Sequence, residues 1–244
     1  MQLLHSNTTN RSVNFSLQKQ MRNPIVQEFR SVLSKLLLIK SSVSMLFGDN
    51  SLDAVGDLTY GLLDTPSYDL MAQHLKQDPA SAALIRDRYI PPAHDLDKLL
   101  TLPQDSLGYI YAAKMKKMGF DPNLHKGMVA ESDAYYVEMR ISQTHDLWHI
   151  VTGFDTSFIN EIGLQAFYLS QFAYPVGTML VGNSLMSMTL REPAQLPQLI
   201  EAIAQGLQMG KTAKSLFAQK WEEGWEKPLT RWQTELNIQP IQHE

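Results

Sequence analysis

The sequence predicts an all-α fold, a single-domain helical bundle, and three observations lead to this prediction. Apolar residues recur at intervals of three and four along most of the chain, which is the period of an amphipathic helix. No stretch alternates β-branched with polar residues, and no Asn-Gly or Asp-Gly pair marks a hairpin. The 244 residues, 44% of them hydrophobic, suffice for one buried core. We expect a flexible N-terminal arm over residues 1–24 and one all-helical domain over residues 25–244.

The charge and the cysteine content argue against several classes of protein. A net charge of −4 speaks against nucleic-acid binding, because neutralising phosphates takes an excess of Lys and Arg. Without cysteine there is no disulfide, and any metal must be held by nitrogen and oxygen atoms. The first residues lack the apolar core of a secretory signal and carry no acid before Glu28. An organellar transit peptide and an ordinary arm both fit; the arm, on a cytoplasmic protein, is the simpler interpretation.

The first half of the chain contains four predicted helices. The first covers residues 24–47 and is stopped by Gly48. Its apolar positions, three or four apart, are Ile25, Phe29, Val32, Leu36, Ile39, Val43 and Leu46. Two more helices begin where a capping residue precedes proline, at Thr65-Pro66 and Asp78-Pro79. The fourth is expected over about residues 104–118 and closes at a glycine.

The second half begins with a long helix over about residues 133–152, ended by Gly153. A short link, FDTS, then offers Asp155, Thr156 and Ser157 as N-caps for the next helix. Tyr174-Pro175 should break that helix in two.

The last part of the chain predicts a helix over about residues 198–227, stopped by Pro228, and a short one in LTRWQTELNI. Trp221 and Trp225 lie four apart and are interpreted as a packed helix face. A membrane-interface belt and a dimer contact remain alternatives for these two residues.

Two histidines, His145 and His149, lie four residues apart in THDLWHIVTGF and therefore share one face of the predicted helix. Asp146 lies about 60° from His149 around the axis, near enough to be a ligand or to hold one in place. On a continuous helix Glu161 would point elsewhere. A stop at Gly153 leaves His149 and Glu161 each about 6 Å from the turn, so an antiparallel hairpin brings them opposite one another. The result is a two-nitrogen, two-oxygen set from two helices, as metal-binding bundles use.

Such ligands suit Zn²⁺ and also Mg²⁺, Mn²⁺ or Fe²⁺, and the mixture does not choose among them. Histidines paired casually with carboxylates are the alternative without a metal. The H-E-x-x-H pattern of zinc proteases fits poorly, because Asp146 is one carbon shorter than the glutamate required. An HD-type phosphohydrolase acting on a nucleotide or prenyl phosphate stays open, since a second His-Asp pair occurs at His94-Asp95.

Residues 162–190 contain no charged side chain. A membrane span, a buried helix pair and the wall of an apolar ligand chamber all fit such a run. The proline within it leaves pieces of only about 20 Å each, too short for a span. A buried helix pair is the simplest interpretation, but Gly163, Gly177 and Gly182, which leave room beside the backbone, and flexible methionines also support an apolar lipid-binding groove next to Glu161. Its candidate lipid contacts are Phe167, Met179, Gly182 and Met186.

The complete pattern H-D-x-x-H, eleven residues, then Glu resembles the signature of the fourth coenzyme Q (ubiquinone) biosynthesis protein family. Here it reads His145, Asp146, His149 and Glu161. The segments LGYIYAAKMKKMGFDPN, YYVEMR, LWHIVTGF and WEEGWEKPLTRW are also similar to that family. The resemblance covers about residues 25–238.

The resemblance implies an all-helical homodimer that associates peripherally with a membrane, the mitochondrial inner membrane in a eukaryote. It implies a divalent metal, usually taken as zinc, on His145, Asp146, His149 and Glu161, and a groove for a polyprenyl lipid or quinone precursor. Two roles follow for such a protein. One is oxidative decarboxylation of a polyprenylated hydroxybenzoate; the other is a lipid-presenting scaffold for the other quinone-biosynthesis enzymes.

One departure from the family concerns the turn of helix before the motif. The family usually shows an Arg-Tyr-Arg-Glu-like run there, whereas this chain has Arg140-Ile141-Ser142-Gln143. The metal set is intact, but recognition of the ligand head differs, and a related protein with another prenyl ligand is an alternative. Glu138 shares a helix face with His145 and is interpreted as a structural carboxylate. The sequence assigns no catalytic residue.

Overall fold

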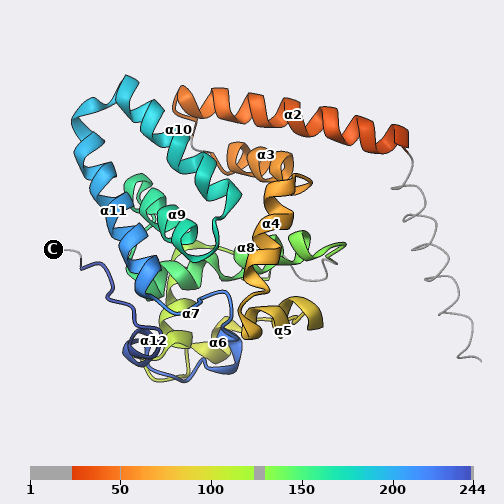
Figure 1. The fold of residues 1–244 in the computed structure, drawn as a ribbon. Coiled ribbons are helices and arrows are strands. Elements are labelled where there is room, and N and C mark those ends of the chain that lie inside the picture. Colours follow the sequence, from red (N-terminus) through yellow and green to blue (C-terminus); the bar gives the residue numbers. More distant parts are fainter. Residues whose placement is uncertain (1–23, 50, 124–129, 243–244) are drawn as a thin grey trace, which may run out of the picture.

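Helices supply all the regular structure of the described residues in this computed structural model, which are 24–49, 51–123 and 130–242 (Figure 1). Within them no strand forms, and the one isolated β-bridge joins Ser106 to Pro228. The all-α prediction is confirmed. The proposed N-terminal arm lies almost entirely outside the described residues.

The helices follow one another in a simple order along the chain. They are α2 (Pro24–Leu46), α3 (Leu52–Leu63), α4 (Pro66–Leu75), α5 (Pro79–Asp87), α6 (Leu96–Leu99), α7 (Leu107–Met118), α8 (Asp133–Thr152), α9 (Phe158–Phe172), α10 (Pro175–Arg191), α11 (Leu196–Thr212) and α12 (Leu229–Glu235). Two short 3₁₀ helices, η1 (Pro193–Gln195) and η2 (Trp221–Glu223), lie between the later ones.

The predicted helix starts follow from local capping. Pro66 and Pro79 begin α4 and α5, and the Asp78 carboxylate accepts a hydrogen bond from the Ser81 amide. The start expected near residue 104 falls instead at Leu107. The reason is that Ser106 caps the helix with its hydroxyl, accepting from the Tyr109 amide.

The single long helix predicted over residues 198–227 is wrong. α11 ends at Thr212, and Ala213 is extended. The chain leaves the helix because Leu216 and Phe217 turn into the core, where both are fully buried. Trp221 and Trp225 do pack, but not on one helix face: Trp221 lies against Trp232 at 4.8 Å between ring centroids, and Trp225 stacks on Tyr111 at 5.2 Å.

Helix α8 is the central element, since it contacts α4, α5, α7, α9 and α12. Its buried residues lie on every side of it and include Tyr136, Val137, Leu147, Trp148 and Val151, none of them measurably exposed. A helix packed on all sides is held rigidly. The side chains at its C-terminal end are therefore presented from a fixed support.

Helices α9 and α11 pack at very close range through glycine. A Cβ on Gly206 would lie 2.0 Å from the Gly163 carbonyl oxygen, and one on Gly210 would lie 2.7 Å from that of Phe167. The room that Gly163 was expected to leave for a ligand is therefore filled by a neighbouring helix. The uncharged run forms two helices: α9 is largely buried, whereas α10 keeps one face partly exposed, with Met186 exposed by 51%. No helix in the part of the chain that the structure describes is both long and apolar enough to cross a membrane.

A buried ion pair joins α8 to the C-terminal segment. The Arg140 guanidinium donates to both carboxylate oxygens of Glu222, at 2.7 and 3.0 Å, and to the Gln219 carbonyl at 2.9 Å. Burial raises the pKa of Glu222, but His94 and the Arg140 guanidinium outweigh it and lower that pKa to about 2. Arg140 matches the first arginine of the family's run, and only the three residues after it differ. It thus has a structural partner in Glu222.

We expect Glu222→Gln to lower the free energy of unfolding by about 3–5 kcal/mol, because it leaves the buried Arg140 charge without its counterion. The pKa of Glu222 is about 2 in the folded protein against an ordinary 4.5, so its contribution is complete above about pH 4.5 and is lost as the pH falls toward 2. Thermal unfolding against pH measures this. Glu223→Gln, at an exposed neighbour, should leave the profile unchanged; an equal effect there would refute the assignment.

Candidate metal centre

A tight reversal after α8 forms the frame of the site. Gly153 ends α8 with φ of +80°, a conformation open mainly to glycine. A Cβ there would also lie 2.6 Å from the Ile241 carbonyl oxygen. The Asp155 carboxylate accepts hydrogen bonds from the Ser157 amide and the Asn160 side chain, both at 2.8 Å, and so shapes the start of α9. Ser157 is the N-cap residue of α9.

This reversal brings His145, His149 and Glu161 together. The His149 Nε2 lies 3.1 Å from the His145 Nε2 and 3.0 Å from a Glu161 carboxylate oxygen. The same oxygen lies 3.5 Å from the His145 Nε2. One ligand atom of each residue thus lies within 4.8 Å of the other two. The spacing-based expectation that α8 and α9 bring Glu161 opposite the histidines agrees with these distances.

Each of the three side chains is oriented by a second contact. The His149 Nδ1 lies 2.8 Å from the Phe154 carbonyl oxygen, which can only accept, so Nδ1 carries a proton and Nε2 is the nitrogen that faces the site. The His145 Nδ1 lies 2.9 Å from the Tyr168 hydroxyl. The Gln165 amide donates to the second Glu161 oxygen at 2.8 Å and leaves the first for the histidines.

The electrostatics of the group call for positive charge between the three side chains. Burial lowers the pKa of His145, but the Glu161 carboxylate and the nearby Asp146 outweigh it, and the net shift is upward. Burial raises the pKa of Glu161, yet the two histidines hold it far below its ordinary range. Either a proton or a cation satisfies such a set.

The distances fit a metal ion. Ligands at about 2.0–2.1 Å around a tetrahedral zinc lie about 3.3 Å from each other, and the observed separations are 3.0, 3.1 and 3.5 Å. Two imidazole nitrogens and one carboxylate oxygen are donors that zinc and similar divalent ions take. Three protein ligands leave one position for water or a substrate, the arrangement of catalytic rather than structural sites.

Asp146, the fourth expected ligand, does not join this group. Helix geometry explains why Asp146 lies apart from His145. Successive helix positions are rotated by about 100°, and Asp146 directly follows His145, so the two side chains point to different sides of α8. It is half-buried and acts electrostatically on His145 and on Tyr111 and Lys114 of α7.

Lys114 is a site residue that the sequence did not reveal. It is half-buried on α7, and burial lowers the pKa of its ammonium despite the attraction of Asp146, Asp155 and Glu161. None of the ion pairs among the described residues involves it. Lys114 is therefore a positive charge near the three ligand residues, where it acts on His145. The one sequence signal that could have identified Lys114 is its position on the amphipathic helix predicted over residues 104–118.

A half-buried carboxylate, Glu138, lies beside the aromatic residues next to His145. Glu138 accepts hydrogen bonds from the hydroxyls of Tyr68 at 2.8 Å and Tyr174 at 2.9 Å. Burial raises the pKa of Glu138. Tyr168, which contacts His145, lies 5.4 Å from Tyr174 between ring centroids. Glu138 therefore anchors the aromatic layer that supports the site, as a structural carboxylate would.

The four expected lipid contacts do not lie together. Phe167 is fully buried on α9, where it packs on Trp148 at 6.0 Å. Met179, Gly182 and Met186 form a strip on α10 that is half-buried to exposed. Nothing lies within 4 Å of a Cβ built on Gly182, so the strip has open space beside it.

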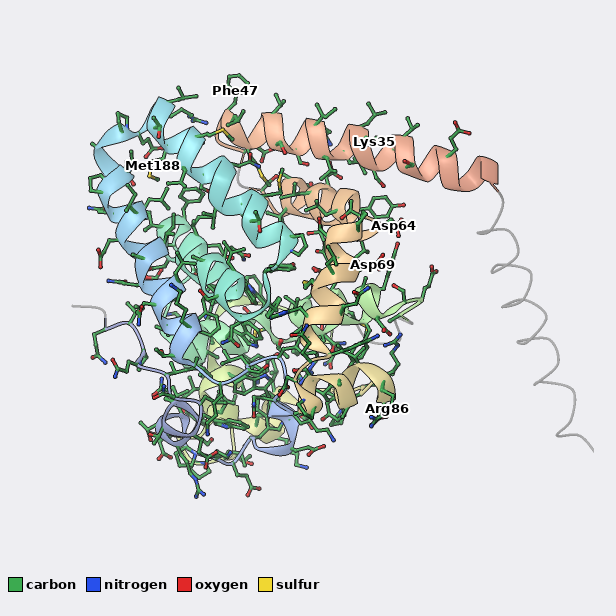
Figure 2. All side chains as sticks on the ribbon, viewed as in Figure 1. Lys35, Phe47, Asp64, Asp69, Arg86 and Met188 are labelled. Atoms are coloured by element: carbon green, nitrogen blue, oxygen red, sulfur yellow. The ribbon has the colours of Figure 1, made fainter. Side chains whose placement is uncertain are left out.

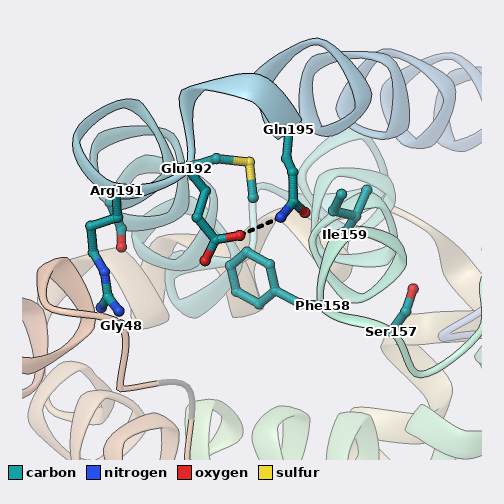
Figure 3. Close-up of a pocket in the computed structure, with 9 residues that line it drawn as sticks. Gly48, Ser157, Phe158, Ile159, Arg191, Glu192 and Gln195 are labelled. Carbon is teal, nitrogen blue, oxygen red and sulfur yellow. Dashed lines mark hydrogen bonds between the residues drawn. The ribbon is translucent and has the colours of Figure 1, made fainter.

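A cavity of about 300 Å³ lies between the start of α9 and the end of α10, and Figure 3 shows it. It is lined by Gly48, Ser157, Phe158, Ile159, Ser187, Met188, Arg191, Glu192 and Gln195. The Arg191 guanidinium lies against Gly48, and Gln195 donates to Glu192. This lining is mixed rather than apolar, and none of the three ligand residues contributes to it.

The second His-Asp pair has structural roles. The His94 Nδ1 lies 3.1 Å from the Tyr111 hydroxyl and its Nε2 lies 3.8 Å from Glu222, all inside the protein. Asp95 caps α6 by accepting from the Lys98 amide. These contacts account for both residues, and the described part of the chain gives no support to an HD-type phosphohydrolase.

Fold and site together define a helical protein with a candidate two-histidine, one-carboxylate metal centre. The family described as Coenzyme Q (ubiquinone) biosynthesis protein Coq4 matches residues 27–242. The chain belongs to this family, which confirms the resemblance and supports a role in ubiquinone biosynthesis.

Individual relatives agree with this membership. The ubiquinone biosynthesis protein COQ4 homolog, mitochondrial, of Mus musculus is 28% identical over 174 residues, which cover 70% of this chain and 65% of that protein. The match thus spans just under two thirds of the mouse relative. Its Bos taurus counterpart is 29% identical over 85% of this chain and 79% of its own. The crystal structure of a putative ubiquinone biosynthesis protein from Nostoc punctiforme has 32% identity and a TM-score of 0.75, covering 84% of this chain and 96% of that one.

If the three residues hold a metal, His149→Ala and Glu161→Ala should each lose most of the divalent metal that the parent carries, at least tenfold in affinity, because each removes one of three ligands. Native mass spectrometry with elemental analysis of untreated protein measures this. Asp146→Asn tests the fourth expected ligand. His74→Ala, at an exposed histidine on α4, is the matched control and should retain the metal. Parent-like metal content in both ligand variants would refute the site.

Proposed function

We propose that this protein uses a divalent cation on His145, His149 and Glu161, with Asp146 beside it, to bind the acidic head of a polyprenylated hydroxybenzoate in quinone biosynthesis. The observation that carries the proposal is the spacing of the three donors, at 3.0, 3.1 and 3.5 Å, which matches that of ligands around a tetrahedral ion. The reaction proposed there is removal of the ring carboxyl, with oxidation of the ring carbon.

When bound, zinc would supply Lewis-acid polarisation without redox chemistry, so the oxidative half would need oxygen acting on the electron-rich ring or a redox-active metal in its place. The residues of the chain do the rest. Lys114 is placed to attract the substrate carboxylate, and the Tyr168 hydroxyl holds His145 in position. The buried aromatic layer behind them keeps water from that side of the site.

The strip of Met179, Gly182 and Met186 is our proposed contact for the prenyl tail, with Phe167 giving support from the core. Its partly exposed position favours a second candidate function. A tail held on an outer surface is presented rather than enclosed, which suits a scaffold that hands a lipid precursor to other quinone-biosynthesis enzymes. Either function places the protein peripherally at the membrane that holds its ligand.

One experiment separates the two functions. The purified protein, with its metal content established, is incubated in air with a prenylated 4-hydroxybenzoate, and products are followed by mass spectrometry. Loss of the carboxyl, abolished in His149→Ala, indicates the enzyme. A copurifying prenyl lipid with no turnover indicates the scaffold. If the protein neither copurifies with a prenyl lipid nor removes the carboxyl, both functions are refuted.

Lys114→Met should weaken binding of the carboxylated ligand about tenfold, because one charge-assisted contact of roughly 1–2 kcal/mol is lost. The decarboxylated analogue should bind Lys114→Met and the parent equally. Titration calorimetry with both ligands checks this. Lys117→Met, at an exposed lysine on the same helix, is the matched control. If Lys114→Met lowers the affinity for both ligands equally, Lys114 does not contact the carboxylate.

A further inference from the structure

An amide is buried inside the uncharged run, one helical turn after Glu161. Gln165 is only 5% exposed, and the other buried residues of α9 are glycine, alanine, aliphatic or aromatic. Figure 1 shows α10 and α11 beside α9, and side chains fill the space around these helices in Figure 2. Burying an amide is unfavourable unless hydrogen bonds replace those to water. A leucine or methionine would suit this position better if packing were its only role.

Only one end of the Gln165 amide has a partner. Its Nε2 donates to the Glu161 Oε1 at 2.8 Å, whereas its own Oε1 has no hydrogen-bond partner among the described residues. The Glu161 carboxylate, whose pKa lies far below its ordinary range, only accepts, so the amide nitrogen must face it. A buried oxygen without a donor destabilises the fold. The contact with Glu161 is therefore what the amide provides.

Packing from α10 keeps the amide in this orientation. A Cβ on Gly177 would lie 3.2 Å from the Gln165 Oε1 and 3.1 Å from the Gln165 carbonyl oxygen, so α10 passes directly over the side chain. Turned over, the amide would set its oxygen against the Glu161 carboxylate and lose its hydrogen bond. The donor is thus fixed on one oxygen of Glu161.

The hydrogen bond gives the two oxygens of Glu161 different surroundings. Oε1 accepts from Gln165, whereas Oε2 lies 3.0 Å from the His149 Nε2 and 3.5 Å from the His145 Nε2. Because the donor is neutral, the carboxylate keeps its full negative charge for a cation at Oε2; a lysine or arginine in its place would compete for that charge. Glu161 therefore offers the centre one oxygen rather than two.

The number of oxygen donors bears on which ion fits. Zinc takes four ligands in most protein sites, whereas Mg²⁺, Mn²⁺ and Ca²⁺ favour six or more, mostly oxygen. A carboxylate free to use both oxygens would add a donor and favour the larger number. We propose that Gln165 is a specificity-determining residue of the candidate centre, which by holding the Glu161 Oε1 favours zinc over ions of higher coordination number. This inference rests on the proposed metal centre and concerns which ion it selects.

Chelator-competition titrations of the metal-stripped full chain with Zn²⁺ and with Mn²⁺ test the selection. Gln165→Met keeps the length and packing of the side chain but lacks the donor. Its zinc affinity should fall about tenfold, as expected for loss of such an outer contact. Its manganese affinity should change by about twofold or less, so that the preference for zinc falls about fivefold or more relative to the parent. A purely structural role would weaken both ions alike.

Gln205→Met is the matched control. Gln205 donates to Glu201 at 3.0 Å, in the same four-residue arrangement on the exposed face of α11, so this variant should bind both ions as the parent does. If the parent binds zinc and Gln165→Met keeps the parent's zinc preference, the inference is overturned and the metal centre stands. If the parent binds neither ion, both are overturned.

X-ray absorption at the zinc edge tests the same point without depending on a variant that folds. The zinc-loaded parent should show four nitrogen or oxygen ligands at about 2.0–2.1 Å. In Gln165→Met the shell should gain a longer oxygen contact as the second Glu161 oxygen becomes free to bind. A parent with five or six ligands that include both carboxylate oxygens overturns the role of Gln165, even though the centre itself is then confirmed.

Discussion

The structure around the candidate centre depends on one backbone constraint, the left-handed conformation of Gly153. It ends α8 one turn after His149 and lets the chain reverse within a few residues, so that Glu161 returns to the histidines. A side chain at this position would be strained by the backbone angle and blocked by Ile241. The three donors come from two helices, but their separation is set by this single turn.

The rest of the centre is a set of contacts that hold those donors at a fixed distance. A carbonyl, a phenol and an amide each orient one of them, through Phe154, Tyr168 and Gln165. Behind them lies an aromatic layer with Glu138 at its polar end. The Glu161 carboxylate between two imidazoles is stabilised by positive charge, which a proton on a histidine or a bound cation supplies, and the packing around α8 holds the three side chains in place.

Local signals predicted most of the fold and the convergence of His145, His149 and Glu161, because helix angles and a glycine stop are properties of neighbouring residues. Contacts between distant segments were beyond that reasoning. Lys114 comes from another helix, and Leu216 and Phe217 leave the expected 198–227 helix for a core that only the tertiary fold creates. The glycines read as room for a ligand, such as Gly163, mostly serve helix packing.

The tail of the chain reaches back to the turn. The Ile241 amide donates to the Thr152 carbonyl at 2.9 Å, and the Gln233 side chain donates to the Val151 carbonyl at 3.0 Å, so the last turn of α8 is capped by residues more than eighty positions away. A partner or an appended segment that binds or displaces this tail therefore acts on the backbone at Thr152, three residues from the candidate ligand His149. Metal content of the candidate centre and the position of the C-terminal segment should consequently be measured together.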